Sequence, residues 1–188
     1  LHHNHLPNAR ELADLKATLA GFRDLPKGVI ELITRLPKDC PPMHALRTGV
    51  SALGCYDSTA DDDTMDAQRR KALRLIAQIP VIVAYFHRSR QGLPLIAPDA
   101  HLGEAANFLW MIDGVRPSAE KESTMDMCYV LHADHGMNAS TFSARVTIAT
   151  LSDMYSAITT AIGTLKGPLH GGANEGVIKM LQEIGSLD

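Results

Sequence analysis

The chain has 188 residues, of which 45% are apolar, and a mean hydropathy close to zero, as is typical of a soluble globular protein with a substantial core. Its formal net charge is −3, and acidic and basic residues are interspersed, so the sequence lacks the one-signed surface of a nucleic-acid groove. The longest apolar run, from Ile79 to Phe86, is far shorter than the ~20 residues needed to cross a bilayer. We therefore expect small metabolites as partners, and neither nucleic acid nor a membrane.

The cysteines indicate the compartment. Cys40, Cys55 and Cys128 are an odd number and lie far apart in helix-like contexts, which argues against a disulfide framework. No secretory signal is visible. We therefore expect a cytoplasmic protein.

The first third of the chain repeats one pattern, in which apolar residues recur at spacings of three and four. A helix is predicted after Asn8, which forms a possible capping box with Glu11; a second opens at Pro26 and ends before Pro37; a third follows Pro41 and Pro42. Their apolar stripes are Leu12, Leu15, Leu19 and Phe22; Val29, Leu32, Ile33 and Leu36; and Met43, Leu46, Val50 and Leu53.

Helices are predicted in the rest of the chain as well. The run Asp61 to Asp63 is interpreted as a solvated loop or a helix cap, followed by a long helix that is kinked or broken near Pro80. Further helices are expected over 102–112, 118–131, 153–165 and 172–184, and the stretch 141–150 as a buried helix. Sustained two-residue alternation is absent from the sequence, so the predicted fold class is all-α.

The most informative feature is a pair of glycine-flanked histidine loops, with His135 and His170 set 35 residues apart. Glycine beside an imidazole lets the backbone turn sharply and lets a ligand come close. The second loop also opens a helix, where unpaired backbone N–H groups and positive potential collect. The segments are His132-Ala-Asp-His135-Gly-Met-Asn138-Ala-Ser140-Thr141 and Gly167-Pro168-Leu169-His170-Gly171-Gly172-Ala173-Asn174-Glu175.

Two interpretations compete with a catalytic one. A metal-dependent hydrolase could be built on His132, His135 and His170, but a lone His-x-x-His without a Cys pair or a His-Glu-x-x-His helix is a weak metal signal. The chain could also be a non-catalytic helical scaffold in which each histidine is simply buried and hydrogen-bonded. Two loops of this composition favour a catalytic role over a purely structural one, and no metal is expected.

Both loops resemble the citrate synthase family, which carries His-x-x-His-x-x-Asn-x-Ser and, two helices later, Gly-Pro-x-His-Gly-x-Ala-Asn. The likeness extends at lower specificity over essentially the whole chain. It implies a multi-helical fold in which residues 1–188 are part of the α-helical large domain, with the N-terminal and C-terminal regions of the family missing. It also implies condensation of acetyl-CoA with oxaloacetate in the tricarboxylic acid cycle, without a cofactor.

The resemblance assigns roles to individual residues. His170 would donate a hydrogen bond to the acetyl-CoA thioester oxygen as the enol forms, where one such donor contributes ~3–4 kcal/mol. At a helix N-terminus we expect its ring to be neutral. His135 would contact oxaloacetate, with His132 supporting it or lining the pocket, and Gly171 and Gly172 would leave room for the thioester. The histidines would be oriented by hydrogen bonds from Ser140, Asn138 and Asn174. Alternatively, Ser140 or Asn138 caps the helix near Thr141, and Asn174 is an ordinary first-turn residue.

The family's catalytic base, second histidine and carboxylate-binding arginines match no segment of this chain. Asp134, Glu175 and Arg145 do not replace them convincingly, so we expect the 188 residues alone to have no synthase activity. The alternative within the family is 2-methylcitrate synthase, which uses propionyl-CoA, and Asp134 between the two histidines leans weakly toward citrate. A homodimer or a dimer-based larger assembly is expected, because the apolar helices exceed what one small globule must hide.

Overall fold

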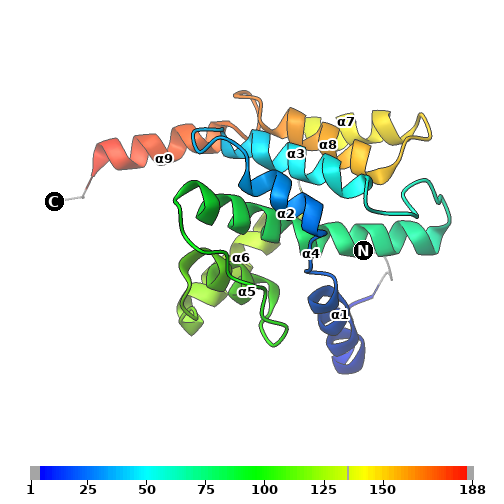
Figure 1. Ribbon diagram of the computed structural model, residues 1–188, viewed down its shortest axis with the longest axis horizontal. Helices are drawn as coiled ribbons and strands as arrows, with labels where there is room; N and C mark the ends of the chain where they lie inside the picture. The colour runs from blue at the N-terminus through cyan, green and yellow to red at the C-terminus, as the bar shows by residue number, and fades with distance from the viewer. Residues whose placement is uncertain (1–4, 135, 186–188) are drawn as a thin grey trace.

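The computed structural model describes residues 5–134 and 136–185, and all the regular structure in that part of the chain is helical (Figure 1). This confirms the predicted all-α class. None of the helices described is long and apolar enough to span a membrane. The helices are α1 (Ala9–Gly21), α2 (Lys27–Thr34), α3 (Pro42–Gly54), α4 (Met65–Arg90), α5 (Glu104–Asp113), α6 (Ala119–Leu131), α7 (Ala139–Ile148), α8 (Met154–Leu165) and α9 (Ala173–Ile184).

Local side-chain chemistry sets several of the helix starts. The capping box at α1 is confirmed, because the Asn8 side chain accepts from the Glu11 backbone N–H at 3.0 Å and the Glu11 carboxylate accepts from the Asn8 N–H at 2.8 Å. Ser118 and Asp153 cap α6 and α8 with their side chains. The predicted boundaries of these helices therefore agree with the structure to within a residue or two.

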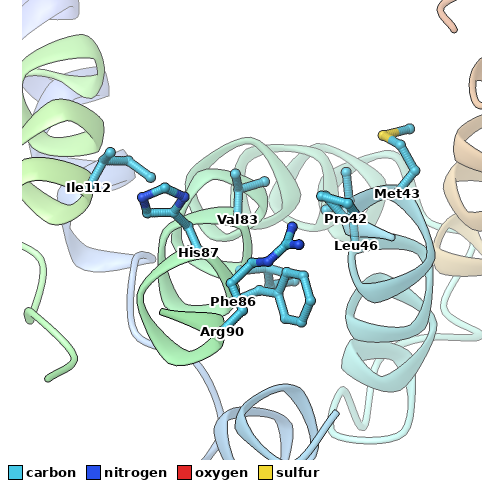
Figure 2. A pocket seen from close by; sticks show the side chains of 9 residues that line it. Pro42, Met43, Leu46, Val83, Phe86, His87, Arg90 and Ile112 are labelled. Atoms are coloured by element: carbon cyan, nitrogen blue, oxygen red, sulfur yellow. The ribbon is translucent and has the colours of Figure 1, made fainter. Parts of the chain in front are cut away.

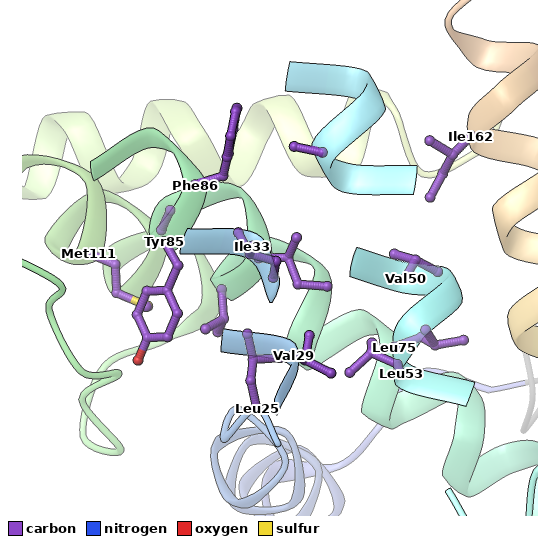
Figure 3. Packing of buried hydrophobic residues seen from close by; sticks show 14 of the residues in the cluster. Leu25, Val29, Ile33, Val50, Leu53, Leu75, Tyr85, Phe86, Met111 and Ile162 are labelled. Carbon is purple, nitrogen blue, oxygen red and sulfur yellow. The ribbon is translucent and has the colours of Figure 1, made fainter. Parts of the chain in front are cut away.

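The long helix α4 runs through the middle of the molecule and contacts most of the others (Figure 1). On one side it packs against α2 and α3, and α3 in turn packs against α8, which pairs with α7. On another side it meets α5, which carries α6. The core between these helices includes Val29, Ile33 and Val50, all fully buried (Figure 3). Val81 and Ile82 of α4 are fully buried in the same cluster.

Of the two expectations at Pro80, a kink or a break, the break is wrong, since α4 continues through it from Met65 to Arg90. Proline inside a helix costs about 3 kcal/mol because it removes one backbone hydrogen bond and crowds the preceding turn. The residues on either side of Pro80 compensate, because Gln78, Val81 and Ile82 are buried against neighbouring helices and the Gln78 amide donates to the Asp24 carbonyl at 2.7 Å.

Residues 141–150 are largely helical, as predicted, but the expectation that this helix is buried is wrong. No residue of α7 is buried, and Phe142 and Val146 are 61% and 52% exposed. Only the side that faces α8 is covered within this chain. The apolar stripe of α9, including Val177 and Leu181, is likewise exposed as the helix projects from the bundle (Figure 1).

A buried carboxylate ties the start of α8 to α4. Asp57, whose side chain is 4% exposed, accepts from the Tyr155 hydroxyl at 2.6 Å and pairs with the Arg74 guanidinium at 2.9 Å. Its other oxygen accepts from the backbone N–H and hydroxyl of Thr59. Burial alone would raise the pKa of Asp57, but the bonds from Tyr155 and Thr59 and the charge of Arg74 outweigh it and hold that pKa well below its ordinary value.

This arrangement makes stability depend on pH in a defined direction. Because the pKa of Asp57 is depressed in the folded state, its contribution is complete above the ordinary value near 4 and is lost as the pH falls below it. We predict that Asp57→Asn lowers the free energy of unfolding by about 2–3 kcal/mol at pH 7. Urea denaturation should show the difference from the parent narrowing between pH 5 and pH 2. Asp39→Asn, at an exposed position, is the control, and a difference that stays constant with pH would contradict the prediction.

Candidate active site

The structure brings one residue of each histidine loop into contact. The Ser140 hydroxyl lies 2.6 Å from Nε2 of His170, although the two residues are 30 positions apart. Ser140 is in the first turn of α7 and His170 follows the end of α8, and these two helices lie side by side, joined by a short connection over 149–153 (Figure 1). The hairpin thus places the start of one helix beside the end of the next.

The loop that carries His170 is a tight turn between α8 and α9. The carbonyl of Gly167 accepts from the His170 backbone N–H at 2.9 Å and from the Gly172 N–H at 3.2 Å. The His170 carbonyl then accepts from the N–H of Ala173, the first residue of α9. These bonds fix the backbone of His170 just before a helix N-terminus, and its side chain is half-buried.

The two glycines after His170 are needed for the close packing of this loop. A Cβ on Gly171 would lie 2.4 Å from Cδ1 of Leu165 and 2.6 Å from the Leu165 carbonyl oxygen, and one on Gly172 would lie 2.9 Å from the Gly167 oxygen. The space that a Cβ would need is therefore already filled, because the loop packs closely on the last turn of α8. The expectation that these glycines also leave room for the thioester stays a prediction.

The first histidine loop is defined in part. His132 caps the end of α6, with Nδ1 2.7 Å from the Cys128 carbonyl oxygen. Asp134 accepts from the backbone N–H of Gly136, whose φ of 64° is a left-handed conformation that favours glycine. His135, predicted to bind substrate, lies outside the described residues.

Asn138 is placed at the N-terminus of α7, where its side chain accepts from the Thr141 N–H at 2.8 Å. Of the two roles considered for Asn138 and Ser140, capping therefore describes Asn138 and contact with the histidine describes Ser140. Asn174 and Glu175 are exposed residues of the first turn of α9, and within the part of the chain described here no hydrogen bond joins the Asn174 side chain to His170. Arg145 is exposed on α7.

No group of three or more His, Cys, Asp or Glu side chains able to hold a metal is found among residues 5–134 and 136–185. The hydrolase hypothesis also depends on His135, which those ranges omit. In the same ranges Cys40, Cys55 and Cys128 are free of disulfides.

A separate cavity of about 180 Å³ lies between α3, α4 and α5 (Figure 2). Its lining is mostly aliphatic and aromatic, and the Arg90 guanidinium lies 5.6 Å from the centroid of the Phe86 ring. His87 also lines it. No residue of either histidine loop contributes, so this cavity is not the site that the sequence indicates.

Two residues that bear on the site, Ser143 and Thr164, lie outside both histidine motifs. The Thr164 hydroxyl of α8 donates to the Ser143 oxygen of α7 at 2.9 Å, and the Ser143 hydroxyl donates to the Ser140 carbonyl at 2.9 Å. The detectable signal was the helical spacing of Ser140, Ser143 and Thr147, which puts small hydroxyl residues along one side of α7. This spacing identifies the polar side of α7 but not Thr164, its partner on α8.

The packing of Gly171 generates a stability prediction. Gly171→Ala should lower the free energy of unfolding by about 1–3 kcal/mol, because the added methyl group meets Leu165 at distances no real Cβ tolerates. The control is Gly176→Ala inside α9, where a Cβ meets nothing within 4 Å and alanine should stabilise the helix by about 0.5–1 kcal/mol. Urea denaturation measures both, and equal stability of the two variants would count against a tightly packed loop.

The family model described as "Citrate synthase, C-terminal domain" matches residues 1–188, the whole chain. Citrate synthase of Deinococcus radiodurans is 51% identical, over 97% of this chain and 48% of its own length. The 2-methylcitrate synthase of Mycobacterium tuberculosis strain H37Rv is 47% identical, over 96% of this chain and 45% of its own length.

The structural comparison agrees with the sequences. Citrate synthase of Thermoplasma acidophilum, solved as a ternary complex with carboxymethyl coenzyme A and oxaloacetate, has a TM-score of 0.91 and 32% identity, covering 97% of this chain and 48% of its own. The chain thus spans about half the length of these relatives. By sequence along its whole length, and by fold, it belongs to the citrate synthase family.

Proposed function

We propose that the protein containing this chain is a citrate synthase, which condenses acetyl-CoA with oxaloacetate and hydrolyses the thioester to release citrate and CoA. The observation that supports this most directly is the contact between Ser140 and His170, one residue from each of the two motifs. The Deinococcus relative, half identical in sequence, is a citrate synthase, and the Thermoplasma enzyme was solved with carboxymethyl coenzyme A and oxaloacetate.

The Ser140 contact indicates which ring nitrogen of His170 donates to the substrate. A neutral imidazole carries one N–H, and the position of that proton follows the hydrogen bond made by the other nitrogen. If the Ser140 hydroxyl donates to Nε2, the proton sits on Nδ1. We propose this tautomer, in which Nδ1–H is the donor to the substrate and Ser140 keeps the ring in the required orientation.

This donor addresses the difficult step of the reaction. Removing a proton from the methyl group of a thioester builds negative charge on the thioester oxygen, and a donor already in place stabilises that charge without reorganisation. We infer that His170 supplies the hydrogen bond while a carboxylate base takes the proton. The family resemblance puts that base, the oxaloacetate-binding arginines and a second histidine in other segments, with His135 and His132 on the oxaloacetate side.

A homodimer, or a larger assembly of dimers, is proposed as the working form. It is supported by the apolar side chains of α7 that this chain leaves uncovered, Phe142 at 61% and Val146 at 52% exposure, next to the candidate site. A second copy laid against this face would remove them from water. We propose a cytoplasmic location on the evidence of the three cysteines.

The 2-methylcitrate synthases are the second candidate, because a relative with that name is nearly as similar as the citrate synthases. The two activities differ by one methylene in the acyl group, which a pocket discriminates by about 10- to 200-fold. We predict that kcat/KM of the full-length protein is higher for acetyl-CoA than for propionyl-CoA. The measurement is thiol release with each acyl-CoA at saturating oxaloacetate, and a preference for propionyl-CoA would assign the second activity.

Loss of the proposed donor gives the main test. We predict that His170→Ala in the full-length protein lowers kcat by about 10²–10³-fold, as for removal of one oxyanion donor. His101→Ala, at an exposed histidine outside both loops, is the control and should retain activity. Thiol release with acetyl-CoA and oxaloacetate is the assay, in which the 188-residue chain alone should show no turnover. Unchanged activity of His170→Ala would contradict the proposal and favour the scaffold hypothesis.

A further inference from the structure

A hydroxyl pair joins α7 to α8 one turn away from the contact between Ser140 and His170. Thr164, in the last turn of α8, donates to the oxygen of Ser143 at 2.9 Å. It is one of two threonines on α8 whose hydroxyl also reaches the carbonyl four residues earlier, the other being Thr160. Only Thr164 has a side-chain partner on the neighbouring helix among the hydrogen bonds of the described residues.

The Ser143 hydroxyl has one proton, which it donates to the Ser140 carbonyl at 2.9 Å, and its oxygen accepts from Thr164 at 2.9 Å. The single Thr164 proton is shared between this oxygen and the Thr160 carbonyl at 3.1 Å. The Ser140 side chain, in turn, meets Nε2 of His170. A chain of hydrogen bonds thus runs from the last turn of α8 through Ser143 to the backbone of the residue that holds the histidine.

The last turn of α8 supports His170 from the other side as well. Leu165, the last residue of α8, leaves no space for a Cβ at Gly171, and just after the helix the carbonyl of Gly167 accepts from the His170 N–H at 2.9 Å. The end of α8 is therefore linked to the Ser140 backbone through Ser143 and to the His170 loop through Leu165. The distance between the Ser140 hydroxyl and the His170 ring thus depends on the spacing of α7 and α8 at Thr164.

We propose that Thr164 and Ser143 are positioning residues for His170: their hydrogen bond sets the spacing between α7 and α8 at which Ser140 orients the imidazole. The inference rests on the proposed function in so far as its effect is seen in turnover. A small change of spacing is enough, because misplacement of a catalytic group by about 1 Å can cost up to 10²-fold in rate.

The variants follow from the two threonines. Thr164→Val removes the hydroxyl and keeps the β-branched shape, Thr164→Ser restores the hydroxyl, and Thr160→Val is the matched control, with the same bond to its own helix but an exposed position. Ser143→Ala, alone and combined with Thr164→Val, tests whether the two act as a unit. Each is made in the full-length protein, and kcat and KM for oxaloacetate are measured together with the ¹⁵N resonances of the His170 ring.

We expect Thr164→Val to lower kcat by about three- to tenfold with KM changed less than twofold, and Thr164→Ser to recover most of the loss. The ¹⁵N resonances of His170 should move in Thr164→Val and stay in place in Thr160→Val, a result that a loss of stability alone does not produce. The combined variant should be no worse than the more impaired single variant.

Two outcomes would overturn the inference. One is a Thr164→Val protein with the parental kcat and unchanged His170 resonances, while His170→Ala is inactive. In that case Thr164 does not position His170, and the proposed function stands. The other is equal effects of Thr164→Val and Thr160→Val. If His170→Ala stays active the proposed function fails instead, and the ring resonances of Thr164→Val still decide whether the hydroxyl pair positions the imidazole.

Discussion

The hydrogen bond between Ser140 and His170 is the interaction on which the site depends. It joins the start of one helix to the turn after the next, so it exists only while α7 and α8 keep their pairing. A single bond of this kind contributes about 0.5–1.5 kcal/mol to stability, too little to hold the hairpin together. The hairpin must therefore be fixed by other contacts, and the bond then selects one orientation of the imidazole.

Those contacts lie at both ends of α8. At its start Tyr155 donates to the buried Asp57, which Arg74 of α4 also holds, so the helix is anchored to the centre of the bundle. At its end Leu165 packs against Gly171 and Thr164 reaches across to α7. The helix between them has Tyr155, Ala157 and Ile162 buried against the core. A rigid helix held at two points is a suitable support for a residue that must be placed accurately.

Much of the fold could be predicted from sequence because its signals are local. Helix ends are defined within a few positions by capping residues, here Asn8, Ser118 and Asp153. Helix faces are defined by apolar residues at helical spacing. Pro80 misled because burial on both sides of it depends on α2, α3 and α5, which a local rule does not consider. The exposure of α7 was missed for the converse reason, since the described residues leave Phe142 and Val146 largely uncovered.

The site was partly predictable. The histidine motifs and Ser140 follow from the family resemblance, and Asn138 from capping rules, but the sequence could not choose between contact and capping for the two. The sequence singles out Gly171, but it does not reveal the packing that excludes alanine there, because the clash is with Leu165 and depends on the three-dimensional structure. The bond from Thr164 to Ser143 crosses two helices and has no counterpart in a linear pattern.

The central claim is that His170 donates a hydrogen bond to the thioester oxygen of the bound acyl-CoA. Isotope-edited infrared spectroscopy of acetyl-CoA labelled at the carbonyl carbon, bound to the full-length protein, measures this polarisation directly. We expect the carbonyl stretch to move to lower frequency on binding and His170→Ala to abolish this shift. A carbonyl frequency that is the same in the parent and in His170→Ala would contradict it.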